Sequence, residues 1–239
     1  MSRITGQVRI VGAGLLGASI GHALVMRGVD VILHDASRTN VSLAIDYGAG
    51  RAPAEGDDPS LVIVAVPPDA TADVIASELA AWPNATVTDV SSVKAGILRE
   101  LESLGADLTR YVGSHPLAGR ERGGAISARA DLFIGRPWVI TGGQGKHRRL
   151  VEDLVIELEA LPVTMTAEEH DASVALVSHV PQVVSSLLAR RLNGASEPAV
   201  GLAGQGLRDT TRIASSNPEL WVQILGEKAR DHLRNVRHE

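Results

Sequence analysis

The chain has 239 residues, with 44% hydrophobic and 3% aromatic side chains, a formal net charge of −5 at pH 7 and no cysteine. The length fits one large domain or two smaller ones, and the missing cysteines exclude disulfides and thiolate metal sites, so we expect no metal. The acidic balance argues against a nucleic-acid surface. With no signal peptide and no apolar run of the ~18 residues that a membrane helix needs, we expect a cytoplasmic protein without a membrane partner.

The first two thirds of the chain alternate short apolar runs with helical patterns. Strands are predicted at residues 7–13, 29–35, 61–67, 85–90, 111–114, 137–141 and 163–165. Helices are predicted between them at residues 15–27, 39–47, 70–81, 94–104 and 147–160. Nearly continuous apolar strands are typical of parallel sheets covered on both faces. The order therefore predicts an α/β fold with a doubly wound, mainly parallel sheet.

A glycine-rich turn follows the first predicted strand and opens the first helix. Gly12, Gly14 and Gly17 have G-x-G-x-x-G spacing, with Leu15 and Leu16 between the last two. Such glycines allow a tight turn, the approach of a pyrophosphate to the backbone, and close packing of helix on strand. The free N–H groups at the helix start would bind the phosphates. We therefore expect a Rossmann-type dinucleotide site that includes all five residues.

An acidic residue ends the second predicted strand, where a dinucleotide's ribose would lie. Asp35 is placed to accept hydrogen bonds from the adenosine ribose, and its charge would repel a 2′-phosphate, which favours NAD. Arg38 could pair with such a phosphate, so NADP stays a second possibility. Val66 and Pro67, after the third strand, are expected to line the same cleft.

The pattern becomes helical after residue 165. A helix over residues 167–192 is predicted to present a broad apolar face, with a kink at Pro181. That face comprises Val174, Val177, Val180, Val184, Leu187 and Leu188. A glycine-rich link at 201–206 precedes a second predicted helix at 218–237. We expect a dinucleotide-binding domain over residues 1–165 and an all-α domain for substrate binding and dimerisation over residues 166–239.

Polar clusters follow several strands, at the sheet edge where open α/β sheets bind ligands. Ser92 and His115 follow strands, and His179 lies on the long predicted helix. Structural alternatives stay open for this cluster: Ser91, next to Ser92, could cap a helix, and His179 could be a core histidine. A glycine-flanked loop is expected to begin at Gly113 and to hold His115.

Five segments together resemble a known family. Gly12-Ala-Gly-Leu-Leu-Gly17, Asp89-Val-Ser-Ser-Val-Lys94, His115-Pro-Leu-Ala-Gly119, Ser178-His-Val-Pro181 and Arg208-Asp-Thr-Thr-Arg212 resemble the prephenate and arogenate dehydrogenases of tyrosine biosynthesis. The resemblance covers about residues 8–225. It implies an oxidative decarboxylation in which a cyclohexadienol ring gives a hydride to a nicotinamide, loses its carboxylate as carbon dioxide and becomes aromatic.

The resemblance also implies roles for individual residues. His115 would bond the ring hydroxyl and withdraw its proton, with Ser92 helping to hold both groups. Arg212 would bind a substrate carboxylate through its guanidinium, and His179 and Arg208 would line the substrate pocket. Two further residues are implied: Glu121 as an acidic gate, and Trp221 near the active site of the partner in a homodimer formed through the helical domain.

The chain departs from the family's pattern at three positions. Gln182 stands where many relatives have a second histidine, Arg120 where a small hydroxyl residue is usual, and Arg208 where lysine is frequent. Because Gln182 can donate to a ketone or accept from an ammonium, arogenate stays an alternative to prephenate as the substrate. A hydroxyacid or imine dehydrogenase and a non-catalytic NAD-sensing module are the remaining alternatives.

Overall fold

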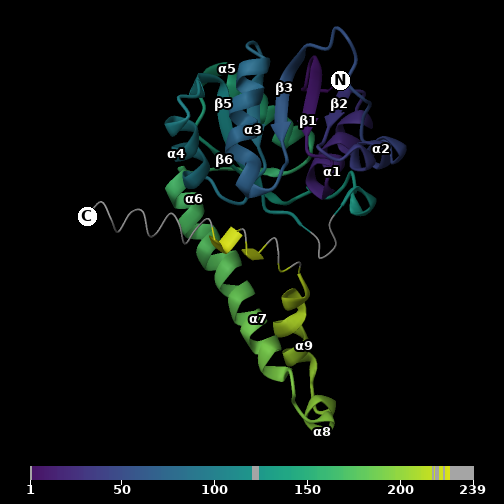
Figure 1. Cartoon of the computed structure of the whole chain (residues 1–239), viewed down its shortest axis with the longest axis vertical. Helices are drawn as coiled ribbons and strands as arrows, with labels where there is room; N and C mark the ends of the chain where they lie inside the picture. The colour runs from purple at the N-terminus through teal and green to yellow at the C-terminus, as the bar shows by residue number, and fades with distance from the viewer. Residues whose placement is uncertain (1, 120–123, 217, 219–220, 223, 227–239) are drawn as a thin grey trace, which may run out of the picture.

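The structure is a computed structural model of the whole chain, and it describes residues 2–119, 124–216, 218, 221–222 and 224–226. Figure 1 shows an α/β body from which a long helical arm descends. The N-terminus begins in the body, and the chain enters the arm only after the last strand of the sheet. The predicted fold class, a mainly parallel Rossmann-type sheet followed by a helical region, is confirmed.

The body is built on a seven-stranded sheet with the order β2-β1-β3-β4-β5-β6-β7. The strands are β1 (Gln7–Val11), β2 (Val31–His34), β3 (Pro59–Val64), β4 (Thr86–Asp89), β5 (Tyr111–Pro116), β6 (Pro137–Thr141) and β7 (Leu161–Thr164). Neighbouring strands are parallel except β5 and β6. The order reverses between β1 and β3, and such a switch point opens a crevice for ligands at the carboxyl ends of the strands.

Helices cover both faces of this sheet. They are α1 (Leu15–Val25), α2 (Arg38–Asp46), α3 (Pro68–Ala81), α4 (Ala95–Ser103) and α5 (Gly145–Glu157). Alternate residues of one strand pack on opposite faces of the sheet. Ile63 of β3 belongs to the core under α1 and α5, whereas Val62 and Val64 belong to the core under α3 and α4. Burial on both faces explains why the strands are apolar without alternation.

The segment expected to be a loop from Gly113 is instead partly strand. His115 and Pro116 are the last residues of β5 and lie opposite Val139 and Trp138 of the antiparallel strand β6. Proline has no N–H to donate, and it is tolerated here because it ends the strand. His115 is consequently held by a sheet rather than by a turn.

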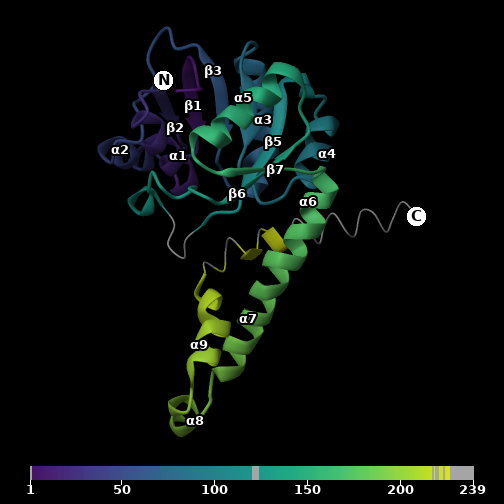
Figure 2. The same ribbon diagram turned by 180° about the vertical axis from the view of Figure 1, so that it is seen from behind.

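The arm begins with a rod of three consecutive helical segments. These are α6 (Ala167–Val174), the π-helical segment η3 (Ala175–His179) and α7 (Val180–Leu192). Pro181 lies in the first turn of α7, directly after the π-helical segment. Proline cannot supply the N–H of a regular helical turn, and the break predicted there takes the form of this wider turn within one continuous rod (Figure 2).

The chain then folds back along the rod. It forms α8 (Glu197–Gly201), α9 (Gln205–Thr211) and the short 3-10 helix η4 (Arg212–Ser215), with α9 beside α7 in both views. The expected glycine link at 201–206 therefore holds the end of one helix and the start of another. Most of the helix predicted at 218–237 lies outside the described residues.

Most of the predicted apolar face of the rod is exposed, although Val174 is buried and Leu188 is half-buried. Val177, Val180, Val184 and Leu187 are 64%, 52%, 53% and 60% exposed. The side of the rod that is buried carries polar residues instead, among them His179, Gln182 and Ser185. Among the described residues, the helix 167–192 is long enough to cross a membrane, and an 18-residue window within it has a mean hydropathy of 1.5. The exposed face requires another surface to cover it.

Candidate active site

The glycine turn between β1 and α1 has the geometry that a pyrophosphate requires. Gly12 has φ +107°, and a Cβ there would lie 2.3 Å from the Ala65 carbonyl oxygen. A Cβ on Gly17 would lie 1.9 Å from the Gly12 carbonyl oxygen, so this glycine sets the contact of helix with strand. A Cβ on Gly14 would meet nothing within 4 Å. Two glycines therefore close the turn, and the third leaves space above it.

The start of α1 is open to a ligand. Gly14 is its N-cap residue and offers no side chain to the free N–H groups of the first turn. Leu15 and Leu16 form that turn and are partly exposed. An uncapped helix start carries a partial positive charge and unpaired donors, which suit a phosphate. The turn thus fits the dinucleotide that the motif predicts.

Asp35 lies directly after β2, next to the glycine turn. Its carboxylate accepts hydrogen bonds from the backbone N–H of Ala13 at 2.7 Å and of Ser37 at 2.8 Å. The carboxylate is thereby fixed beside the turn, at the position expected for a ribose contact. Arg38 is exposed in the first turn of α2. Val66 and Pro67 follow β3 at the same edge of the sheet, partly buried and exposed respectively.

A buried polar network lies at the carboxyl end of β4. Asp89 is fully buried and forms an ion pair with Lys94, itself 2% exposed. The same carboxylate accepts from the hydroxyl of Tyr111 at 2.8 Å and from the N–H groups of Ser91 and Ser114 at 2.9 and 3.3 Å. Removing one partner of a buried ion pair costs about 3–5 kcal/mol. The network therefore holds the ends of β4 and β5 together.

His115 extends from the end of β5 next to this network. Burial lowers its pKa well below the usual value, and the charges of His170, Lys94 and His179 lower it further. An imidazole with such a pKa is neutral at physiological pH and has one ring nitrogen free to accept a proton. His115 can therefore accept a proton at the edge of the sheet where the glycine turn lies, as a weaker base than an unperturbed imidazole.

His170 and Asp171 of α6 complete this cluster, and the sequence alone did not identify them. The side chains of Thr166 and Glu169 cap the start of α6, so His170 and Asp171 lie within its first two turns. His170 Nε2 lies 2.8 Å from His115 Nδ1, and His170 Nδ1 lies 2.7 Å from Asp171 Oδ1. The available signal was a His-Asp pair in the first two turns of the long predicted helix.

Asp171, rather than Ser91, caps the start of α4. Its two carboxylate oxygens accept the backbone N–H groups of Lys94 at 3.0 Å and Ala95 at 3.1 Å, at the start of α4. Ser91 instead forms a local turn, with its Oγ 3.5 Å from the N–H of Val93. Ser92, in the same turn, is partly buried. A residue of the arm therefore anchors a helix of the body.

His179 lies close enough to His115 to influence its charge state. It is 5% exposed, and its ring meets that of Trp221 edge-on, with centroids 5.8 Å apart. The structure thus brings His179, from the arm, to the same region as His115, from the body. Trp221 contacts this chain's own histidine, whereas the expected contact was with a partner's site.

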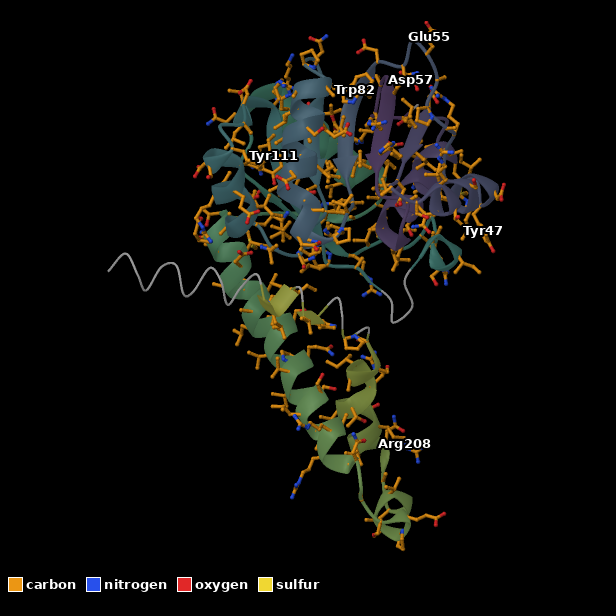
Figure 3. All side chains as sticks on the ribbon, in the orientation of Figure 1. Tyr47, Glu55, Asp57, Trp82, Tyr111 and Arg208 are labelled. Atoms are coloured by element: carbon orange, nitrogen blue, oxygen red, sulfur yellow. The ribbon has the colours of Figure 1, made fainter. Side chains whose placement is uncertain are left out.

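The remaining predicted substrate residues lie along the arm or outside the described residues. Gln182 is buried and its amide donates to the Ile213 carbonyl at 3.0 Å, so it ties α7 to η4. Arg208 is exposed and donates to the Ala203 carbonyl at 3.3 Å, far from the body as Figure 3 shows. Arg212 is exposed at the start of η4. Glu121 lies outside the described residues.

Two family models cover most of the chain. The nucleotide-binding domain of prephenate dehydrogenase matches residues 20–165, and its dimerization domain matches residues 166–238. A probable prephenate dehydrogenase of Streptomyces niveus is 38% identical over 92% of this chain and 62% of its own length. A cyclohexadienyl dehydrogenase of Zymomonas mobilis is 30% identical over 93% of this chain and 80% of its own length. A prephenate dehydrogenase of Bacillus subtilis is 30% identical over 94% of this chain and 65% of its own length.

Solved structures of the same kind align with the whole chain. The prephenate dehydrogenase of Aquifex aeolicus, in complex with hydroxyphenyl propionate and NAD+, has a TM-score of 0.83 at 27% identity and covers 100% of this chain and 90% of its own. The arogenate dehydrogenase of Synechocystis has a TM-score of 0.76 at 26% identity, covering 97% of this chain and 87% of its own. The chain spans less than two thirds of the length of two of its curated relatives.

Proposed function

Because this chain belongs to the prephenate dehydrogenase family, we propose that it catalyses the NAD-dependent oxidative decarboxylation of prephenate to 4-hydroxyphenylpyruvate. The observation that carries this proposal is the position of His115 at the end of β5, on the carboxyl edge of a sheet whose first turn has space for a pyrophosphate. Bound NAD would accept the hydride from the ring carbon that bears the hydroxyl. The chain's own residues would bind the ring, orient it and handle the proton of that hydroxyl.

In the proposed mechanism His115 accepts the hydrogen bond of the ring hydroxyl. As the hydride leaves, positive charge develops on that oxygen, and a neutral imidazole can take up its proton. Loss of carbon dioxide from the opposite ring carbon then makes the ring aromatic. Ser92 would help to hold the hydroxyl, and His179 and Arg212 would bind the anionic part of the substrate through charge-assisted hydrogen bonds. Glu121 would contribute to the same pocket, whereas Arg208 lies far along the arm and the amide of Gln182 ties α7 to η4.

The cofactor assignment rests on the carboxylate beside the glycine turn. Asp35 is held there by two backbone N–H groups, and its negative charge disfavours the 2′-phosphate of NADP. We propose NAD as the cofactor, with the boundary between its domain and the substrate domain at residues 165/166. Gly12, Gly14 and Gly17 would form the pyrophosphate turn, and Leu15, Leu16, Arg38, Val66 and Pro67 would line the cofactor site.

We propose that the protein acts as a homodimer. The rod exposes Val177, Val180, Val184 and Leu187 along one face, and an exposed apolar stripe of this kind marks an interaction surface. A second copy would cover it through a two-fold interface. Covering this stripe would also remove the apolar surface by which the rod resembles a membrane helix, in keeping with a cytoplasmic enzyme.

Arogenate is the second candidate substrate, favoured by the structural similarity to an arogenate dehydrogenase. Arogenate carries an ammonium, for which the pocket would need a carboxylate or another acceptor. The charged residues assigned to the pocket are mostly cationic, and the amide of Gln182 donates to a backbone carbonyl. These features favour the dianion prephenate.

The test measures NADH formation by the purified chain with prephenate, arogenate and simple hydroxyacids. We expect prephenate to have the highest kcat/KM. His115→Asn should lower turnover by roughly 10²–10⁴-fold, the usual effect of a positioned base, whereas the control His22→Asn, on α1, should not. Arg212→Ala should act mainly on KM, because the carboxylate is present before the reaction. A tenfold preference for arogenate, or full activity of His115→Asn, would refute the assignment.

A further inference from the structure

We propose that His170 and Asp171 form a hydrogen-bonded relay that fixes the tautomer of His115, with its proton on Nδ1 and its lone pair on Nε2. This inference deepens the proposed function and rests on it for its catalytic meaning. His170 and Asp171 belong to α6, at the top of the helical arm, whereas His115 belongs to β5 of the body. The relay thus links the two parts of the chain at the base.

Successive contacts connect His115, His170, Asp171 and the first N–H groups of α4. His115 Nδ1 lies 2.8 Å from His170 Nε2, and the two rings meet edge-on at 77°. The opposite nitrogen of His170 lies 2.7 Å from Asp171 Oδ1. Asp171 in turn accepts two backbone N–H groups at the start of α4. His170 is fully buried, so these contacts are shielded from competition by water.

The proton positions follow from what each group can donate and accept. An ionised carboxylate only accepts, and Asp171 is held in that state by the N–H groups at a helix start. An imidazolium at His170 would donate from both nitrogens, so the relay requires a neutral His170, which then carries its proton on Nδ1 and donates it to Asp171. Its Nε2 then has only a lone pair, so His115 must donate from Nδ1. The other nitrogen of His115, Nε2, is left as the basic one.

Several titratable groups face His115. The groups that face it are His170 and Asp171 from α6, His179 from η3 and the Lys94–Asp89 pair beside β4. When His115 takes a proton on Nε2, its Nδ1–H bond to His170 becomes charge-assisted and stronger. Asp171 is the carboxylate at the end of that series of contacts. The relay would therefore stabilise the charge that the reaction places on His115.

A tautomer measurement tests the relay without any turnover. The whole chain is labelled with 15N-histidine, and long-range proton–nitrogen correlations are recorded at about pH 8, above the ordinary histidine pKa of about 6.5. Signals are assigned with His115→Asn and His170→Gln. We expect both histidines to be neutral with the proton on Nδ1. A proton on Nε2 of His115 would overturn the relay, whatever the activity.

Kinetics of matched variants provide the second test. Asp171→Asn can donate to His170, which reverses both tautomers, so we expect kcat to fall roughly 10²–10⁴-fold with KM within about 3-fold. Glu168→Gln removes the same charge from an exposed position on the same helix and should keep full kcat. Unchanged kcat and tautomer in Asp171→Asn would overturn the relay.

A pair of substitutions at the central histidine separates positioning from folding. His170→Gln can still accept from His115 through its side-chain oxygen, and we expect it to retain more activity than His170→Phe, which cannot. Equal kcat in the two variants, with NAD affinity intact, would contradict the relay. If the unaltered chain does not oxidise prephenate, the proposed function fails, while the tautomer spectrum of the same sample still decides the relay.

Discussion

Lys94 and His115 lie in one buried cluster but have opposite electrostatic neighbours. Burial lowers the pKa of both. For Lys94 the carboxylates of Asp89 and Asp171 oppose this effect and offset part of it. For His115 the neighbours His170, Lys94 and His179 lower the pKa further. At the scale of single residues, the fold therefore pairs one buried amine with carboxylates as a structural group and keeps one histidine neutral as a base.

The lowered pKa of His115 predicts how stability depends on pH. In the unfolded chain its pKa is about 6.5, above the folded value, so the unfolded state binds more protons as the pH falls. The stability from neutral His115 is present above about pH 6.5 and is lost below it, by at most about 1.4 kcal/mol per pH unit for this group. Urea unfolding of the unaltered chain and of His115→Asn between about pH 5 and 8 should show a shallower acid loss in the variant.

His147 contributes in the same pH range, because burial and the charges of Lys146 and Arg110 lower its pKa too. His147 is present in the unaltered chain and in His115→Asn. The difference between their two curves of unfolding free energy against pH therefore reports the contribution of His115. Asparagine can still donate to His170 in place of the ring Nδ1–H. If the unfolding free energies of the two proteins fell equally with decreasing pH, His115 would not be held neutral in the fold.

The charge of Asp35 predicts the choice of cofactor. Asp35→Asn keeps an oxygen that can accept from the N–H of Ala13 but removes the charge that repels a 2′-phosphate. We expect the preference for NAD over NADP to fall by about tenfold, or about 1.4 kcal/mol, as measured by titration of both cofactors. Arg38→Ala in the same chain should cancel the gain in NADP affinity. An unaltered protein that already prefers NADP would contradict the assignment.

The turn before α1 shows how one short element combines folding with binding. Gly12 and Gly17 have no space for a side chain, whereas Gly14 does. Gly14 also has φ −77°, which alanine adopts without strain. The three glycines of one motif therefore have separable purposes, although the sequence spacing treats them alike.

Two alanine substitutions test this separation. Gly14→Ala should leave the melting temperature nearly unchanged and weaken the binding of NAD, since the methyl group of the alanine would occupy the space of the phosphates. Gly17→Ala should lower the stability of the fold by at least the ~1–3 kcal/mol typical of an overpacked site, because its Cβ would meet the Gly12 carbonyl oxygen at 1.9 Å. Thermal unfolding and NAD titration measure the two effects. Equal destabilisation by both would refute the distinction.

At the scale of the whole molecule, the arm has its polar and apolar faces in an unusual arrangement. The side of the rod buried in the chain contains His179, Gln182 and Ser185, and the apolar side is exposed. A helix normally buries its apolar stripe. The stripe on this rod is therefore available for a second molecule, which supports assembly through the arm.

Charged substitutions on this stripe should separate the subunits. Val180→Glu with Val184→Glu places two charges at the expected contact, and burying them without a partner is costly. We expect light scattering to give a dimer for the unaltered chain and a monomer for this variant. Met26→Glu, at a position 69% exposed on the body, is the control and should stay dimeric. A monomeric, fully active unaltered chain would contradict the proposal.

The sequence by itself determined the features that depend on neighbouring residues. Apolar runs predicted the parallel strands, the glycine spacing predicted the turn, and the position of Asp35 after β2 placed it beside that turn. These follow from short-range rules: a parallel sheet must be covered on both faces, and a tight turn requires glycine. The motif with His115 was also visible, although not its place in a strand.

Only the tertiary structure decided which distant residues meet. The contacts of His115 with His170, of Asp171 with the start of α4, and of Asp89 with Tyr111 join segments separated by 22 to 77 residues. The sequence also predicted an apolar rod that would pack against a second copy, but not the polar contacts on its other side, because periodicity gives the spacing of a face and not its partners. Contacts of this kind are set by how the arm docks on the body, and no local pattern encodes that docking.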